Sequence, residues 1–157
     1  MTDKHRKIRM ITAWACIIMW GIFAVILSRQ SGNTTSEISY GISNRLEVLL
    51  AYIGINIHVE LINEIIRKAA HIVIYLVLGG LLYNALAYTF RRSSKHSLVL
   101  SIVLCLTASL LDELQKIFIP GRHCDPEEIL LNSIAGIVGI ALCYFFRISK
   151  NTKTNYQ

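Results

Sequence analysis

The sequence predicts an all-α, polytopic membrane protein: a four-helix transmembrane bundle with short amphipathic helices in its first outer loop. Composition is the first observation, since 54% of the 157 residues are hydrophobic and 17% are charged, whereas a soluble domain carries about 25% charged residues. The second is that apolar stretches cover about residues 10–27, 69–90, 98–119 and 129–146, each long enough to cross a bilayer as a helix. The third is that basic residues gather at their ends.

One domain over residues 1–157 is expected, because short connections keep consecutive spans packed together. The net charge of +6 does not indicate a nucleic-acid partner, since no aromatic-rich basic patch interleaves the basic residues. The cysteines lack the paired spacing of a zinc or redox site, so we expect no metal and no cofactor; they are Cys16, Cys105, Cys124 and Cys143.

The first span, 10–27, contains no charged residue and at about 1.5 Å per residue is nearly as long as the hydrocarbon core is thick. Its basic start resembles a signal peptide, but the apolar run is longer than usual and no A-x-A site follows it. We therefore expect a retained anchor, with cleavage as the alternative. Four spans place both termini on one side, and the positive-inside rule makes that side cytoplasmic. The cytoplasmic basic residues are Lys4, Arg6, Lys7, Arg9, Arg91, Arg92, Lys95, Arg147, Lys150 and Lys153.

The segment between the first two spans divides into two parts. Residues 28–43 are polar and rich in turn formers, which predicts an irregular loop. In residues 44–66, apolar positions recur beside acidic ones, with Gly54 as a break. This pattern predicts two short amphipathic helices along the outer membrane surface.

The remaining three spans carry their ionisable groups at one end only. If they cross the bilayer in alternating directions, these groups form one layer near the outer face. Arg67, His71 and Tyr75 share a helix face at i, i+4 and i+8. Ionisable groups are costly at this depth, so a layer of them indicates a functional site.

The other two spans complete the layer. Asp112 is expected about 12 Å below Pro120 by helical rise, on one face with Gln115 and Lys116, while Glu113 points roughly 100° away. Glu128 and Asn132 share a face of the last span. A purely structural alternative is that ion pairs, such as Asp112 with Lys116 or Arg67, hold the bundle in register.

We assign acid-base candidates to His71, Asp112 and Glu113, because an imidazole near a carboxylate can exchange protons near neutral pH. No sequence motif of a named catalytic class is present. The ligand-binding candidates are the other polar groups of the layer: Arg67, Lys68, Tyr75, Gln115, Lys116, Arg122, Glu128 and Asn132.

Several motifs together resemble those of the VanZ-like, or teicoplanin-resistance, membrane proteins. They are Arg67-Lys68-Ala69-Ala70-His71, Tyr75, Leu78-Gly79, Asp112-Glu113, Phe118-Ile119-Pro120-Gly121-Arg122, Asn132 and Gly139. Relatives carry Glu at the position of Ile74, Gln at that of Lys116 and Asp at that of Glu128. With Ile74 and Lys116, this layer is less acidic than the family pattern.

The resemblance implies a small protein of the bacterial cytoplasmic membrane, in a family whose namesake lowers susceptibility to the glycopeptide teicoplanin. The basic and polar groups that share the layer predict binding of membrane lipids, in which Arg67, Lys68 and Arg122 hold an anionic headgroup or lipid-linked cell-wall precursor. Asp112, Glu113 and Asn132 would fix the pocket. A membrane enzyme using His71 and Asp112 and a structural scaffold are the alternatives. A transporter is less favoured, because four spans offer little for alternating access. The oligomeric state is not predicted.

Overall fold

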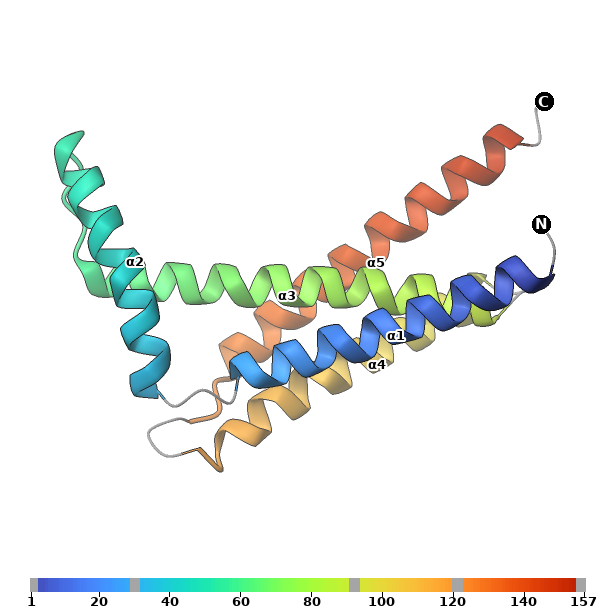
Figure 1. Ribbon diagram of the computed structural model, residues 1–157, viewed down its shortest axis with the longest axis horizontal. Coiled ribbons are helices and arrows are strands. Elements are labelled where there is room, and N and C mark those ends of the chain that lie inside the picture. Colours follow the sequence, from blue (N-terminus) through green and yellow to red (C-terminus); the bar gives the residue numbers. More distant parts are fainter. Residues whose placement is uncertain (1–2, 29–31, 91–93, 120–122, 155–157) are drawn as a thin grey trace.

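The computed structural model describes residues 3–28, 32–90, 94–119 and 123–154, and within these ranges all regular structure is helical (Figure 1). The helices are α1 (Asp3–Ser28), α2 (Gly32–Tyr52), α3 (Val59–Thr89), α4 (Ser94–Lys116) and α5 (Pro126–Thr154). All except α2 are long and apolar enough to cross a membrane. The predicted all-α architecture with four spans is confirmed.

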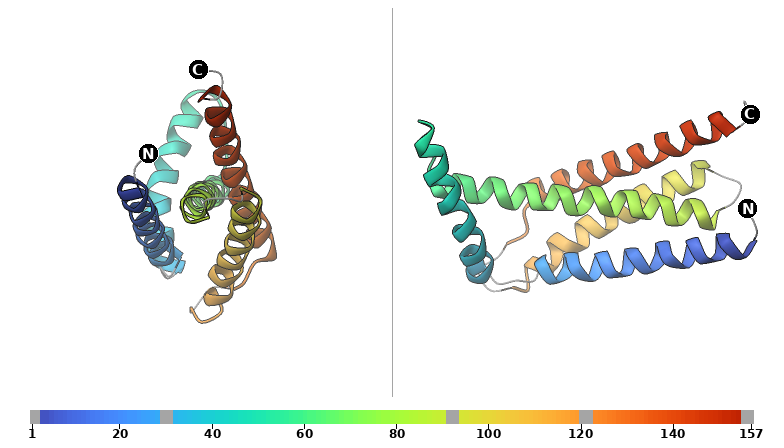
Figure 2. Two further views of the ribbon diagram at one scale, coloured as in Figure 1. Left: turned by 90° about the vertical axis from the view of Figure 1, so that its right-hand side faces the viewer. Right: turned by 45° about the horizontal axis from the view of Figure 1, so that its top comes forward.

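The helices run back and forth along one axis, while α2 lies across one end of the bundle (Figures 1 and 2). Both termini lie at the opposite end. Because α3 and α5 both start near α2, they run in the same direction and α4 runs against them. The predicted orientation, with both termini in the cytoplasm, stays a prediction.

The central helix is α3, which packs against each of the other four. Its closest approach is to α5: a Cβ atom on Gly79 would overlap the Gly136 carbonyl, and one on Gly139 would overlap the Leu76 carbonyl. Glycines at such a crossing let two backbones pack directly, which is a main source of helix association in membranes. The glycines therefore fix the register of α5 against α3.

A stripe of small side chains faces the interior from α4. Ser97, Ser101, Cys105, Ser109 and Glu113 follow one another at four-residue spacing, and each is 0% exposed. Residues four apart lie on one helix face, so the stripe continues directly into Glu113. The packing that draws α4 into the bundle therefore also carries this carboxylate into the interior.

The outer segment differs from its prediction in two places. Gly32–Tyr52 is one helix, so the irregular loop predicted up to residue 43 is wrong from Gly32 on. Low helix propensity of its Ser, Thr and Asn residues is overridden by packing against α3, where Ser43 is fully buried. The predicted break is confirmed, since Gly54 has a φ of 83°.

The prediction of a second, separate amphipathic helix after Gly54 is wrong. This segment forms the first turns of α3, which continues from Val59 to Thr89, because no Gly or Pro interrupts the chain there. Helix α4 ends at Lys116, not at residue 119 as predicted. Residues 117–119 form a turn, as expected ahead of Pro120, which disfavours helix in the residue before it.

Candidate functional site

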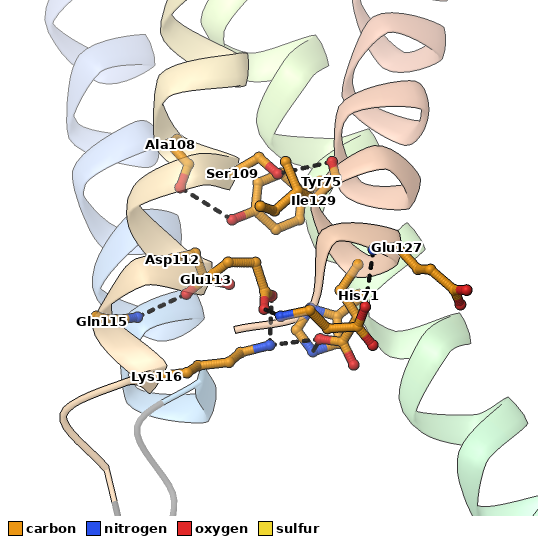
Figure 3. Close-up of polar contacts among 12 residues, drawn as sticks. His71, Tyr75, Ala108, Ser109, Asp112, Glu113, Gln115, Lys116, Glu127 and Ile129 are labelled. Atoms are coloured by element: carbon orange, nitrogen blue, oxygen red, sulfur yellow. Dashed lines mark hydrogen bonds and ion pairs between the residues drawn. The ribbon is translucent and has the colours of Figure 1, made fainter. Parts of the chain in front are cut away.

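Ionisable side chains from α3, α4 and α5 meet at the end of the bundle crossed by α2 (Figure 3). We call Lys116, Glu113, Glu128 and His71 the polar cluster. Lys116 is its centre: its Nζ donates to Glu113 Oε1 and to Glu128 Oε2, each at 2.5 Å. The Lys116 side chain is 4% exposed and that of Glu113 is 0% exposed. The lysine therefore makes one ion pair within α4, to Glu113, and one that links α4 to α5, to Glu128.

The register of α3 against α5 explains why His71 joins this cluster. His71 and Glu128 each lie eight residues, about two helical turns, before the glycine of their helix that forms the Gly79–Gly136 contact. Since the helices run in the same direction, the two side chains reach the same level. His71 Nε2 lies 3.7 Å from Glu128 Oε2.

The two ring nitrogens of His71 have different surroundings. Its Nδ1 atom is buried and has no hydrogen-bond partner in the parts of the chain that the structure describes. A carboxylate beside Nε2 favours the proton on that nitrogen, which leaves Nδ1 of the neutral ring as an acceptor. An imidazole with one nitrogen 3.7 Å from a carboxylate and the other buried is an arrangement that can accept or deliver a proton.

The start of α5 is tied to the cluster by Asp125. Its backbone N–H donates to Glu113 Oε2 at 3.3 Å, and its side chain caps the helix by accepting from the Glu127 N–H at 2.9 Å. The sequence analysis missed Asp125. The signal was present, because an Asp followed by a proline at the first helical position is typical of a helix start.

Asp112 lies beside the cluster, not within it. It accepts a 2.7 Å hydrogen bond from Gln115 (Figure 3). The pairing of Asp112 with Lys116 considered from the sequence is wrong, because the buried face of α4 includes Glu113 and Lys116 and leaves Asp112 half-buried. Helix α4 ends at Lys116, so Asp112 lies one turn, roughly 6 Å, from the helix end. Its predicted distance from Pro120 lies outside the described residues.

Three of the other predicted residues have definite positions. Tyr75 is buried one turn beyond His71 and its hydroxyl donates to the Ala108 carbonyl at 3.4 Å. Lys68 pairs with Glu64 on the surface of α3 at 2.6 Å. Asn132 is 0% exposed, and neither its amide oxygen nor its amide nitrogen has a partner among the described residues.

Of the two arginines predicted to bind a ligand, only Arg67 lies within the described residues. Arg67 is half-buried, one turn before His71 on α3. No side-chain hydrogen bond or ion pair joins it to the residues for which side chains are described. Arg122 lies outside the described residues. In the described parts of the chain, no three His, Cys, Asp or Glu side chains are grouped so as to hold a metal ion.

A bundle of membrane-length helices with ionisable groups buried between three of them defines a polytopic membrane protein with a polar cluster inside its helical bundle. The family model of VanZ/LLP1 matches residues 13–147. The chain therefore belongs to the VanZ/LLP1 family, and the resemblance seen in its motifs is confirmed. No curated protein matches the chain, and no solved structure does. The functional roles of the site residues stay predictions.

Proposed function

We propose that this protein binds an anionic lipid headgroup, or a lipid-linked cell-wall precursor, at the outer leaflet of the bacterial cytoplasmic membrane and thereby affects susceptibility to teicoplanin. One observation carries the proposal: Arg67 is half-buried beside the polar cluster with no partner among the described side chains. A guanidinium at membrane depth needs an anionic partner, and its planar donors match the oxygens of a phosphate.

The neighbouring cations support this role for Arg67 because they are already paired. Lys116 is held by two carboxylates, and Lys68 is held by Glu64. An incoming anion would meet Arg67 first. Arg122 lies outside the described residues, and we include it in the proposed site on the sequence argument alone. Membership in the VanZ/LLP1 family supports the link to teicoplanin, whose target is a cell-wall precursor.

The test compares Arg67→Gln with Lys68→Gln, two cations at neighbouring positions of one helix. Purified protein is reconstituted in phosphatidylcholine nanodiscs, and retention of added phosphatidylglycerol is measured by native mass spectrometry. We expect Arg67→Gln to weaken retention about tenfold, the loss of one charge-assisted contact, and Lys68→Gln to leave it unchanged. Equal retention by wild type and Arg67→Gln would contradict the proposal.

The same pair of variants connects binding to the phenotype. A deletion strain is complemented with each variant, and teicoplanin susceptibility is measured together with the amount of protein in the membrane. We expect Arg67→Gln to behave like the deletion at normal abundance and Lys68→Gln to behave like wild type. Full complementation by Arg67→Gln would separate lipid binding from glycopeptide susceptibility.

A second function, a membrane enzyme acting on such a lipid, is favoured by the geometry of His71. Its orientation by Glu128 at 3.7 Å and its unpartnered Nδ1 suit a general acid or base. In this hypothesis Glu128, not Asp112, is the carboxylate that positions the imidazole. Glu128→Gln would then abolish turnover of the lipid by whole membranes while Arg67-dependent binding persists. Unchanged lipid composition in membranes with and without the protein would exclude the enzyme.

A further inference from the structure

We infer that the proposed lipid site has two parts: Arg67 holds the anion, and Asn132 holds a neutral hydroxyl-bearing group deeper in the bundle. The preferred ligand is then an anionic lipid whose headgroup continues beyond the phosphate into a polyol or sugar. This inference rests on the proposed function and adds the chemical class of the headgroup.

The first step is the position of Asn132. It lies four residues before Gly136 on α5, and Tyr75 lies four residues before Gly79 on α3. Because the two glycines are in contact and the helices run in the same direction, Asn132 lies at the level of Tyr75. Asn132 also follows Glu128 by one turn on the same face. It therefore lies one turn deeper than the pair of Glu128 and His71.

The second step is that neighbouring protein hydroxyls are already used. Ser109 and Ser133 both donate to the Ile129 carbonyl, at 3.1 and 2.6 Å, and Tyr75 donates to the Ala108 carbonyl. Asn132 is fully buried, yet within residues 3–28, 32–90, 94–119 and 123–154 its amide oxygen and nitrogen have no partner. Leaving a buried amide unsatisfied costs the free energy of desolvating both of its polar groups, so the position indicates a bound group that both donates and accepts.

The third step excludes the anion itself from this depth. Glu113 and Glu128 lie between Arg67 and Asn132 along the bundle. These two carboxylates carry two negative charges against the single positive charge of Lys116. A phosphate placed beside Asn132 would have to pass these carboxylates and remain near them. Like charges at short distance in a poorly solvated site repel strongly. A hydroxyl group has no such penalty, and both it and the amide can donate and accept.

The spacing suits a headgroup of this kind. Arg67 and Asn132 differ by eight residues of helical register, or roughly 12 Å along the bundle. The arginine side chain is long and flexible and covers part of that distance. A phosphate followed by glycerol or a sugar covers the remainder, and His71 Nδ1, which lies between the two ends, offers a further acceptor.

The test uses two lipids with the same acyl chains and the same charge. Phosphatidylglycerol carries two free hydroxyls on its headgroup, and phosphatidylpropanol has the same three carbons without them. Retention of each by wild-type protein in phosphatidylcholine nanodiscs is measured by native mass spectrometry. We expect phosphatidylglycerol to be retained about tenfold more tightly, the effect of one or two satisfied hydrogen bonds. A ratio near one in wild type would overturn the inference without any variant.

Asn132→Leu then assigns the preference to one side chain. We expect this variant to bind phosphatidylglycerol as weakly as phosphatidylpropanol, while its retention of phosphatidylpropanol stays at the wild-type level. The matched control is Asn84→Leu, which changes a partly buried asparagine of α3 that bonds to Cys143; it should keep the wild-type ratio. An Asn132→Leu protein that keeps the preference would refute the role of Asn132.

The outcomes separate this inference from the function on which it rests. If Arg67→Gln weakens both lipids equally and wild type does not distinguish them, the anion site stands and the hydroxyl site is wrong. If Arg67→Gln weakens neither lipid, the proposed function itself is wrong.

Discussion

Removing Lys116 should destabilise the bundle more than any other single change in the polar cluster. The lysine is 4% exposed and holds Glu113, which is 0% exposed, and Glu128 at 2.5 Å each. In Lys116→Met the two carboxylates remain buried with no cation between them. Breaking a buried ion pair by removing one partner costs about 3–5 kcal/mol, and here one cation serves two anions. We therefore expect a loss at or above the upper end of that range.

A double variant identifies the cause of that loss. Adding Glu113→Gln to Lys116→Met removes one of the stranded charges, so the double variant should be more stable than Lys116→Met by about 2 kcal/mol or more. If Lys116→Met were destabilised only because the packing of the lysine stem is lost, Glu113→Gln would not restore stability. The matched control is Lys68→Met, since Lys68 also pairs with a glutamate of its own helix but on the protein surface.

The assay is reversible unfolding in mixed micelles by increasing the fraction of SDS, followed by tryptophan fluorescence. The chain provides Trp20, whose indole donates to the Ile74 carbonyl at 2.9 Å and so reports the packing of α1 on α3. Lys68→Met should unfold at the wild-type midpoint. If Lys116→Met does so as well, or if Glu113→Gln deepens its defect, the cluster does not carry the buried charges assigned to it.

Two further predictions concern the packing and the orientation of the bundle. Gly139→Ala should lower the free energy of unfolding by about 1–3 kcal/mol, because its Cβ would overlap the Leu76 carbonyl; Gly21→Ala on α1, which has open space around it, should be neutral in the same SDS titration. Cys124, which lies between α4 and α5, should react with a membrane-impermeant maleimide added to intact spheroplasts if both termini are cytoplasmic. Labelling of Cys124 only after lysis, with Cys124→Ser as the blank, would reverse the proposed orientation.

The sequence predicted the membrane helices because each depends on a local property, a long apolar run. It also predicted which end of the bundle holds the polar groups, since charge at one end of a span is visible without a structure. What failed was the environment of particular acids. Helical geometry correctly separated Asp112 from Glu113, but it could not show which of the two faces the interior.

The answer to that question was encoded outside the charged residues. Four small residues, Ser97, Ser101, Cys105 and Ser109, define the buried face of α4, and Glu113 is the next position on that face. Small residues mark the packed face of a membrane helix better than charged ones do. The first turns of α3 were missed for a related reason: an amphipathic pattern does not show whether a helix stops at the membrane surface or continues into a span.

The same packing makes the polar cluster both costly and well defined. The Gly79–Gly136 contact sets His71 level with Glu128, and the α4 stripe brings in Glu113 with Lys116 beside it. These close helix contacts are enough to hold the helices in register. Buried charges would then cost desolvation free energy without defining the register any further. Ion pairs alone also leave Arg67, His71 Nδ1 and the Asn132 amide without partners among the residues whose side chains are described. Measured from the Gly79–Gly136 contact, Arg67, His71 and Asn132 follow one another at one-turn steps along the bundle. The headgroup that we propose would supply a partner for each of them, which a purely structural role would not.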